Sequence, residues 1–328
     1  MQIQGKVCKP KVFFLRTHKT GSTSIFNILI RAGISRGVNI ALPPPKKKHF
    51  WPKSVGSDDD NRTYNEDFLL YHSILNMSSI EYYYPRSKTL YVSILREVVP
   101  QYKSAFLFFK SWKRFGLAPD INSIESMLNI LKDKSTSSMN RFYHQNINFF
   151  DFGFTNADLM TDESIREAIN KIDAMFDLVM IKELWEESLL LLKEMFCLTI
   201  DQIVVFNINQ VKNDHPELPL YVDQMILEFN RADKMLYDHF YAKLKRMAKK
   251  LQPKEFLELR ERQKYWSDSC INGRVEKIHY QDVKYLAFDV KSNLSKNTQL
   301  ECILRTFNDI DYLRVLRAVK EKHQPKNL

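Results

Sequence analysis

The chain has 328 residues, of which 44% are hydrophobic and 12% aromatic, and its formal net charge is +10. Such a chain can bury a sizeable core, and no Gly/Ser linker or internal repeat divides it. The charge favours an anionic partner, but the sequence has no zinc-finger spacing, RNP-like aromatic motif or dense arginine stripe, which excludes the common nucleic-acid-binding modules. A small, multiply anionic ligand explains the charge with fewer assumptions.

The first predicted element is a strand over residues 12–15, whose short apolar run is typical of a parallel strand covered on both faces. A polar turn over 18–24 follows, and helical spacing of apolar residues begins at Ile25. Backbone N–H groups at the helix start, the hydroxyls of the turn and the ammonium of Lys19 can converge on an oxyanion. An ordinary strand-to-helix turn would explain Gly21 and Ser22, but not the whole Lys-Thr-Gly-Ser-Thr-Ser cluster.

This predicted phosphate-binding loop differs from the P-loop of nucleoside triphosphatases. That motif needs a glycine five residues ahead of Gly-Lys-[Ser/Thr], whereas here Lys19 precedes Gly21 and Arg16 stands where the motif has spacing residues. We therefore expect a phosphate ligand other than a triphosphate.

Residues 43–60 form a polar segment that predicts a surface loop. Its lysines 46–48 are most simply solvated, but together with His49 and Trp51 they could instead border a ligand cleft. The apolar run over 68–75 predicts a strand, which would bring His72 to the same sheet edge as the loop. A single histidine among apolar residues is more often a core side chain than a catalytic one.

A second strand is predicted over residues 89–95, and it ends at Arg96. Pro100 suits the first position of the helix that follows, which carries Ser104. Arg96 and Ser104 could both face a phosphate at the carboxyl edge of the sheet. Taken alone, Arg96 is as readily a structural ion-pair partner. It supports a phosphate site only because it occurs together with the loop.

Beyond residue 120 the pattern is mainly helical. Helices are predicted over 123–131, 162–172, 184–196 and 220–251, and a short buried strand over 202–207. The segments 243–250 and 260–264 are predicted charged helix faces. The order of elements predicts an α/β fold with a mostly parallel sheet flanked by helices.

With these elements in place, the sequence resembles the 3′-phosphoadenylyl sulfate-dependent sulfotransferases, and within them the galactose 3-O-sulfotransferases, galactosylceramide sulfotransferase included. The turn resembles their 5′-phosphosulfate-binding loop, and the Leu-Arg-Glu segment at Arg96 resembles their 3′-phosphate-binding element. Further similar blocks lie at 149–154, 176–181, 186–193, 204–207 and 236–241, so that the resemblance covers residues 11–271. The chain departs from the family pattern at Val98, usually Pro, and at Leu184-Trp185, usually Tyr-Phe.

The resemblance implies a P-loop-like sulfotransferase fold that transfers a sulfuryl group to a galactose hydroxyl of a glycolipid or glycan, with the 3-hydroxyl expected. It implies His72 as the general base, His18 as a second required imidazole and Lys19 as the cation that neutralises the leaving phosphate. No metal is expected, because Lys19, Arg96 and the loop amides can meet the charge of the donor. The residues implied to bind the donor are Arg16, Thr17, His18, Lys19, Thr20, Gly21, Ser22, Thr23, Ser24, Arg96 and Ser104.

Two other functions remain open at this stage. A nucleotide-dependent kinase would use a similar strand, loop and helix, although the Gly-Lys-[Ser/Thr] order and a magnesium-holding Asp after a strand are both lacking. A non-catalytic glycan-binding relative would keep the fold and lose the cofactor residues, whereas Lys19, His72, Arg96 and Ser104 are all present.

The resemblance divides the chain into a leader remnant over 1–10, a sulfotransferase domain over 11–271 and an extension over 272–328 packed on the same domain. Family members are usually held in the Golgi membrane by an N-terminal helix, so we expect a Golgi lumenal location; no such helix is found in this sequence. Glycosylation sequons at Asn61, Asn76 and Asn293 add slightly to this expectation.

The four cysteines, at positions 8, 197, 270 and 302, allow three fully paired connectivities. Their spacing excludes a close CxxC metal site. The resemblance implies a disulfide between Cys197 and Cys270.

Overall fold

The computed structural model describes residues 2–3, 6–51, 53, 55, 63–109, 131, 145–206, 219–278 and 284–323. The predicted helix over 123–131, apart from its last residue, and the sequon at Asn61 lie outside the described residues. Asn76 begins a helix and Asn293 is exposed in a loop.

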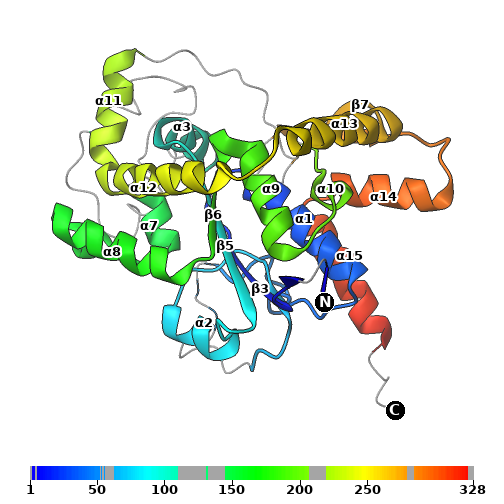
Figure 1. Cartoon of the computed structure of the whole chain (residues 1–328), viewed down its shortest axis with the longest axis horizontal. Coiled ribbons are helices and arrows are strands. Elements are labelled where there is room, and N and C mark those ends of the chain that lie inside the picture. The colour runs from blue at the N-terminus through cyan, green and yellow to red at the C-terminus, as the bar shows by residue number, and fades with distance from the viewer. Residues whose placement is uncertain are drawn as a thin grey trace.

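A parallel sheet forms the centre of the molecule (Figure 1). Its strand order is β4-β3-β5-β6, with β3 at Lys11–Leu15, β4 at Phe68–Leu69, β5 at Thr89–Leu95 and β6 at Leu178–Ile181. Phe14 pairs with Val92 in β5, and Leu95 pairs with Ile181 in β6. Every residue of β5 and β6 is buried, because helices cover both faces of the sheet. The predicted α/β fold is therefore confirmed.

Two predicted strands differ from the structure. The strand expected over 68–75 is only two residues long, so His72 lies on a loop just beyond its end. The strand expected over 202–207 is wrong: Ile200–Ile203 form a helical turn, α10, in which Thr199 and Gln202 cap each other. The fourth strand of the sheet is β6, a Leu-Val-Met-Ile run that sequence analysis did not assign to a strand.

The helices occupy most of the remaining chain. Their bounds are α1 Ser22–Ser35, α2 Met77–Tyr83, α3 Val98–Phe108, α7 Ile147–Asp151, α8 Asp162–Met175, α9 Trp185–Phe196, α11 Leu220–Phe229, α12 Arg231–Ala248 and α13 Pro253–Cys270, with short 3-10 turns at Asn156–Leu159 and Lys182–Leu184. The helix predicted over 220–251 is in fact two helices that meet at Asn230. Helix α3 begins two residues ahead of the predicted Pro100.

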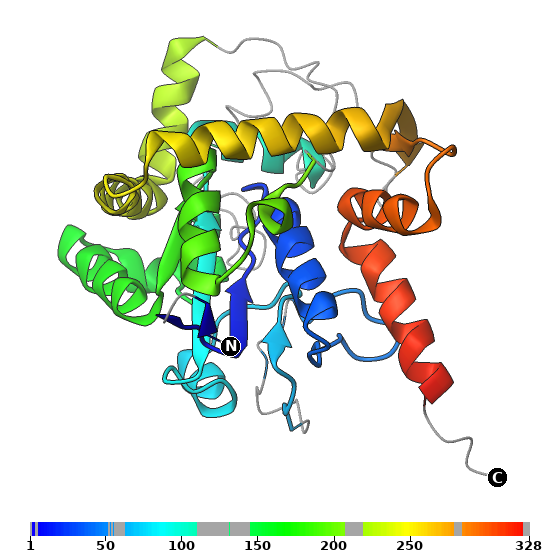
Figure 2. The same ribbon diagram turned by 45° about the vertical axis from the view of Figure 1, so that its right-hand side comes forward.

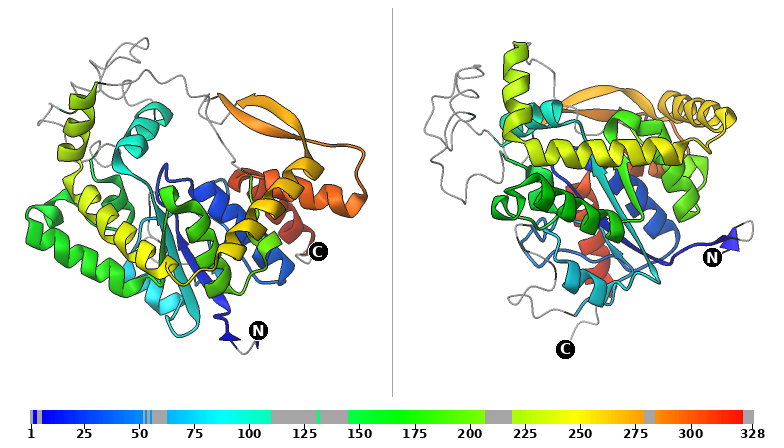
Figure 3. Two further views of the ribbon diagram at one scale, coloured as in Figure 1. Left: turned by 45° about the horizontal axis from the view of Figure 1, so that its top comes forward. Right: turned by 60° about the vertical axis from the view of Figure 1, so that its left-hand side comes forward.

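Helices α9 and α12 pack against β6, while α1 contacts α10 and two C-terminal helices, α14 at Lys296–Thr306 and α15 at Asp309–His323 (Figure 2). A hairpin of β7, Ile271–Ile278, and β8, Lys284–Val290, lies against α13 and α14 (Figure 3). A separate short pair, β1 at Gln2–Ile3 and β2 at Lys6–Val7, lies at the N-terminal end.

Polar and aromatic contacts hold the C-terminal helices against α1. The Asn27 amide donates to the carbonyls of Leu304 and Phe307, at 2.8 and 2.9 Å. The fully buried Tyr312 ring packs edge-on against Phe26. These contacts agree with an extension packed on the same body, although the division of the chain into domains stays a prediction.

The two disulfides join Cys8 to Cys197 and Cys270 to Cys302, so the expected Cys197–Cys270 bond is wrong. Cys270 ends α13 and shares a small apolar cluster with Phe206 and Cys302 of α14. Cys197 ends α9 in a left-handed conformation, and its partner lies just ahead of β3. Tertiary packing therefore chose a pairing that chain spacing leaves open.

None of the helices in the described part of the chain has the length and apolar character needed to cross a membrane.

Candidate active site

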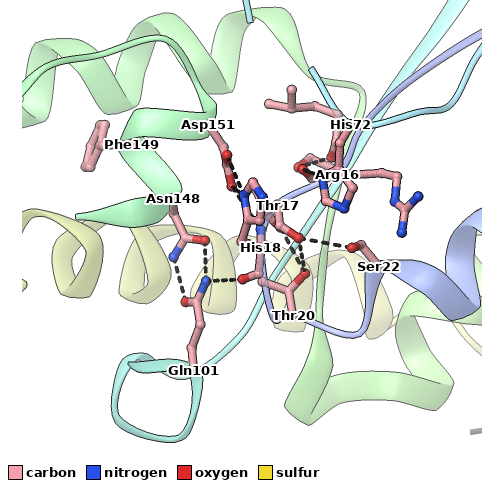
Figure 4. A network of polar contacts seen from close by, with 12 residues as sticks. Arg16, Thr17, His18, Thr20, Ser22, His72, Gln101, Asn148, Phe149 and Asp151 are labelled. Carbon is pink, nitrogen blue, oxygen red and sulfur yellow. Dashed lines mark hydrogen bonds and ion pairs between the residues drawn. The ribbon is translucent and has the colours of Figure 1, made fainter. Parts of the chain in front are cut away.

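The loop between β3 and α1 closes on itself through its own hydroxyl groups (Figure 4). Thr20 and Ser22 both donate to the carbonyl of Thr17, at 3.1 and 3.0 Å, and the Thr17 hydroxyl donates to the carbonyl of Ile94 in β5. All three residues are buried. Since each of these three hydroxyls has one proton to donate, they shape the loop. The donors left for an anion include backbone N–H groups, the Lys19 ammonium and the half-buried Thr23 hydroxyl, which accepts from Arg16 and keeps its own proton.

The backbone of the loop explains the need for glycine. Lys19 and Gly21 both have left-handed φ angles, 61° and 86°, which turn the chain sharply into α1. Gly21 is the N-cap and provides no side-chain cap, and the first turn of α1 has no acidic residue. The positive end of α1 is therefore open to an external anion.

Lys19 and Arg96 lie side by side at the carboxyl edge of the sheet. The Arg96 guanidinium donates to the Lys19 carbonyl at 3.2 Å, and the Lys19 ammonium lies 3.9 Å from the centre of the Phe108 ring. Burial, and then the charge of Arg96, lower the pKa of Lys19 to about 8. Ser104 is partly buried two turns along α3. The two phosphate elements predicted from sequence thus meet on one side of the molecule.

Arg16 belongs to the interior. Its guanidinium donates to Asp309 of α15 at 2.9 Å and to Thr23 at 3.2 Å, and it stacks over the Phe26 ring. Burial alone would raise the pKa of Asp309, but the charge of Arg16 lowers it below its ordinary value. This side chain therefore holds α15 to the loop, and its contact with the donor stays a prediction. Ser24 is buried in α1, where its N–H donates to the Gly21 carbonyl at 3.1 Å.

His18 and His72 come from different loops and stack with ring centres 4.7 Å apart (Figure 4). The Nδ1 of His72 lies 3.0 Å from the Arg16 carbonyl, an acceptor, so Nδ1 carries the proton and Nε2 has the free lone pair. Burial, and then the charges of Arg16 and the neighbouring histidines, hold the pKa of His72 well below its ordinary value. The ring is therefore neutral at physiological pH and able to accept a proton.

His18 is fixed by a buried carboxylate that sequence analysis missed. Asp151 accepts hydrogen bonds from both the backbone N–H and the Nδ1 of His18, each at 2.8 Å. Its side chain is completely buried, which raises its pKa although His18 opposes this. This pairing fixes the tautomer and orientation of the imidazole and leaves its Nε2 for the site.

A further polar network supports this arrangement from α3, α7 and α12. Gln101 donates to the His18 carbonyl at 2.7 Å and exchanges two hydrogen bonds with the Asn148 amide. Buried Asp233 accepts from the N–H groups of Asn148 and Phe149. The one sequence signal for this network was a lone carboxylate in the aromatic block 149–154, because an acidic residue among such neighbours requires partners.

Two aromatic rings border the histidine pair. The ring centres of Trp51 and Phe109 lie 5.3 and 5.7 Å from that of His18, and the backbone N–H of Trp51 donates to the His72 carbonyl at 2.7 Å. The lysines at 46–48 are exposed, as predicted, and Arg317 of α15 donates to the carbonyls of Pro43, Pro44 and Lys47. The C-terminal helix therefore anchors the loop that carries Trp51.

A third cation, Lys182, immediately follows β6, and sequence analysis missed it because β6 was not recognised as a strand. The signal was the one that identified Arg96, namely a basic residue directly after a buried strand.

In the described part of the chain there is no group of three or more His, Cys, Asp or Glu side chains that could hold a metal ion.

The chain matches the family model of galactose-3-O-sulfotransferases over residues 4–297. It is 25% identical to galactosylceramide sulfotransferase of Mus musculus over 289 residues, which are 81% of this chain and 66% of that protein. It is 28% identical to galactose-3-O-sulfotransferase 2 of Mus musculus over 291 residues, 82% of this chain and 72% of the relative. Galactose-3-O-sulfotransferase 3 of Homo sapiens is 28% identical over 241 residues, which are 70% of this chain and 55% of that relative. The match thus spans roughly two thirds of the length of the first of these relatives. Since the family model covers most of its length, the chain belongs to the galactose-3-O-sulfotransferase family.

Proposed function

We propose that this protein transfers the sulfuryl group of 3′-phosphoadenylyl sulfate to the 3-hydroxyl of a galactose in a glycolipid or glycoprotein glycan. The observation that carries the proposal is the meeting of two cations, Lys19 and Arg96, with two stacked imidazoles at one edge of the sheet. Anion-binding groups and a proton acceptor are what sulfuryl transfer to a hydroxyl requires.

The donor would lie against the loop and Arg96. Within the described chain, neither Lys19 nor Arg96 is within ion-pair distance of a carboxylate, and the first turn of α1 has no acidic residue. These cations are therefore free to meet the charge of a phosphosulfate and of a 3′-phosphate. Ser104 is proposed as a hydroxyl donor to the 3′-phosphate.

In the reaction, the acceptor oxygen attacks sulfur while the bond from sulfur to the bridging phosphate oxygen breaks, and that oxygen keeps the electron pair. His72 accepts the hydroxyl proton at Nε2, because its Nδ1 proton is already donated to the Arg16 carbonyl. Lys19 neutralises the phosphate that leaves. His18, held by Asp151, presents its Nε2 to the sulfuryl group as the second imidazole. Positioning and electrostatics supply most of the rate, as they do in phosphoryl transfer.

The acceptor assignment rests on the relatives, whose names specify galactose and, in one case, galactosylceramide. Trp51 and Phe109 support it, because flat aromatic rings beside the proposed base suit the apolar face of a sugar. Two disulfides agree with a proposed location in the secretory pathway, the Golgi lumen, since such bonds persist in oxidising compartments.

Calorimetry with 3′-phosphoadenosine 5′-phosphate and with ATP tests the donor assignment. We expect tight binding of the first and none of the second. A preference for ATP would support the kinase, and no nucleotide binding would support a non-catalytic glycan-binding protein.

A screen of galactose-terminated acceptors with labelled donor then tests the transfer itself. His72→Ala and His18→Ala should each abolish it in a folded protein. Full activity in both variants would remove these residues from the mechanism. Turnover should persist in EDTA, because no residue in the proposal depends on a metal.

A further inference from the structure

Lys182 occupies the same position on its strand as Arg96 does on the neighbouring one. Leu95 and Ile181 are register partners at the ends of β5 and β6, so the next residues, Arg96 and Lys182, leave the sheet side by side. Both lie at the edge where the phosphate loop begins. The position of Lys182 is therefore set by the sheet, a rigid element.

The side chain of Lys182 crosses the start of α1. A Cβ placed on Gly21 would lie 3.3 Å from Cδ of Lys182 and 3.7 Å from its ammonium nitrogen. Gly21 thus serves two purposes: it adopts the left-handed φ of 86°, and it leaves space for this lysine. The ammonium group comes close to the uncapped N-terminus of α1, where the first-turn N–H groups are.

Three cations, Lys19, Arg96 and Lys182, are brought together here, and the charge of Arg96 acts on both lysines. Within the described residues no carboxylate lies within ion-pair distance of any of them. The charge of Glu183 acts on both Arg96 and Lys182, and its Oε2 accepts from the Glu97 N–H and the Tyr237 hydroxyl. Burial, and then the charge of Arg96, lower the pKa of Lys182. Such a cluster is costly in the empty protein, and a multiply charged anion would remove that cost.

A purely structural role for Lys182 is the competing explanation. Its ammonium lies 4.2 Å from the centre of the Trp185 ring, a favourable cation–π contact. That contact explains how the side chain is held, but it does not explain why the lysine extends over Gly21 beside two other cations. The indole acts as a support that keeps the ammonium directed at the loop.

We propose that Lys182 binds the 5′-phosphate of the nucleotide donor together with Lys19 and the N-terminus of α1. The inference rests on the proposed function, because it assigns a further contact to the same donor. In this arrangement Arg96 and Ser104 remain for the 3′-phosphate, and Lys182 contributes to donor affinity and to the charge balance on the leaving phosphate.

The test measures nucleotide affinity by calorimetry for wild type, Lys182→Met and Lys182→Arg. Loss of a charge-assisted contact should weaken binding of 3′-phosphoadenosine 5′-phosphate and of 5′-AMP by about 10- to 100-fold in Lys182→Met. Binding of 3′-AMP should change by less than about threefold, and Lys182→Arg should keep most of the affinity. The exposed Lys249→Met is the matched control, since it removes the same net charge at the end of α12.

The outcomes separate the two proposals. If wild type binds 3′-phosphoadenosine 5′-phosphate and Lys182→Met binds it equally well, the Lys182 assignment is wrong while the sulfotransferase proposal stands. Equal weakening of 3′-AMP and 5′-AMP would overturn the assignment to the 5′-phosphate. If wild type binds neither nucleotide, both proposals fail. Should Lys182→Met not fold, as judged by thermal melting, Lys182→Gln replaces it with the same expectations.

Discussion

Replacing Lys19 with Met should make the ligand-free protein more stable and abolish donor binding. The ammonium is held in a partly buried site beside Arg96, which lowers its pKa from 10.5 to about 8. At about 1.4 kcal/mol per pH unit, this fall corresponds to about 3 kcal/mol of destabilisation by the charged group. The contact with the Phe108 ring offsets about 1 kcal/mol, and residual exposure screens part of the rest. We therefore expect a net gain of about 1–2 kcal/mol for Lys19→Met at pH 7.

The sign of this effect depends on pH in a defined way. Below the folded-state pKa of about 8, Lys19 is charged in both folded and unfolded states, and the whole cost of burying the charge is present. Between about 8 and 10.5 the unfolded state binds more protons than the folded state, so the stability of wild type rises with pH relative to the variant. The advantage of Lys19→Met should therefore disappear by pH 10.

Urea unfolding under non-reducing conditions at pH 7 and pH 10 measures the difference directly. Saturating 3′-phosphoadenosine 5′-phosphate should reverse the order at pH 7, because only wild type binds it. A variant that is less stable than wild type at pH 7, or a stability difference that does not change with pH, would refute the reasoning.

Three further predictions concern the same site. Affinity for 3′-phosphoadenosine 5′-phosphate should fall as pH rises above about 8, by at most about tenfold per pH unit. Lys19→Arg should flatten this dependence, because a guanidinium keeps its proton. Calorimetry from pH 7 to 9.5 measures the affinity, and a flat wild-type curve would show that Lys19 does not bind the phosphate. Asp151→Asn should lower kcat by about 10- to 100-fold because His18 is misoriented, while its nucleotide affinity stays within about threefold of wild type. An equal loss of kcat and of nucleotide affinity would indicate a damaged loop instead. Trp51→Ala should raise the KM for a galactose acceptor by about tenfold and leave the KM for the donor unchanged, and Trp51→Phe should recover most of the acceptor affinity. An unchanged acceptor KM in Trp51→Ala would show that the indole does not contact the sugar.

Local signals in the sequence correctly predicted the first strand of the sheet and the turn and helix that follow it. A buried strand followed by a small, polar turn and a helix is encoded within about twenty consecutive residues, so β3, the loop and α1 could be located from the pattern alone. The bounds of β5 match the prediction, and Arg96 follows directly from them. The meeting of Lys19 and Arg96 at one edge could also be foreseen, because parallel strands bring their carboxyl ends to the same side.

Contacts between distant segments could not be foreseen in the same way. The short apolar runs at 178–181 and 202–207 look alike in sequence. Only packing decides that the first joins β5, while the start of the second belongs to a capped helical turn. Because residues 178–181 were not predicted to be a strand, Lys182 was not recognised as a basic residue that follows one. The resemblance implied the wrong disulfide because four cysteines do not specify which pairs meet in the folded chain.

The sequence by itself determined the polar loop between β3 and α1, the basic residue after β5 and the family, because each depends on neighbouring residues or on a local pattern. Tertiary structure alone decided which partners the residues around the loop contact. It paired the Arg16 guanidinium with Asp309, nearly three hundred positions away. It also placed Asp151 against His18 and the Arg16 carbonyl against His72, which fixes the tautomers of both rings. Buried polar groups need partners, and those partners come from whichever elements the packing of the core brings near.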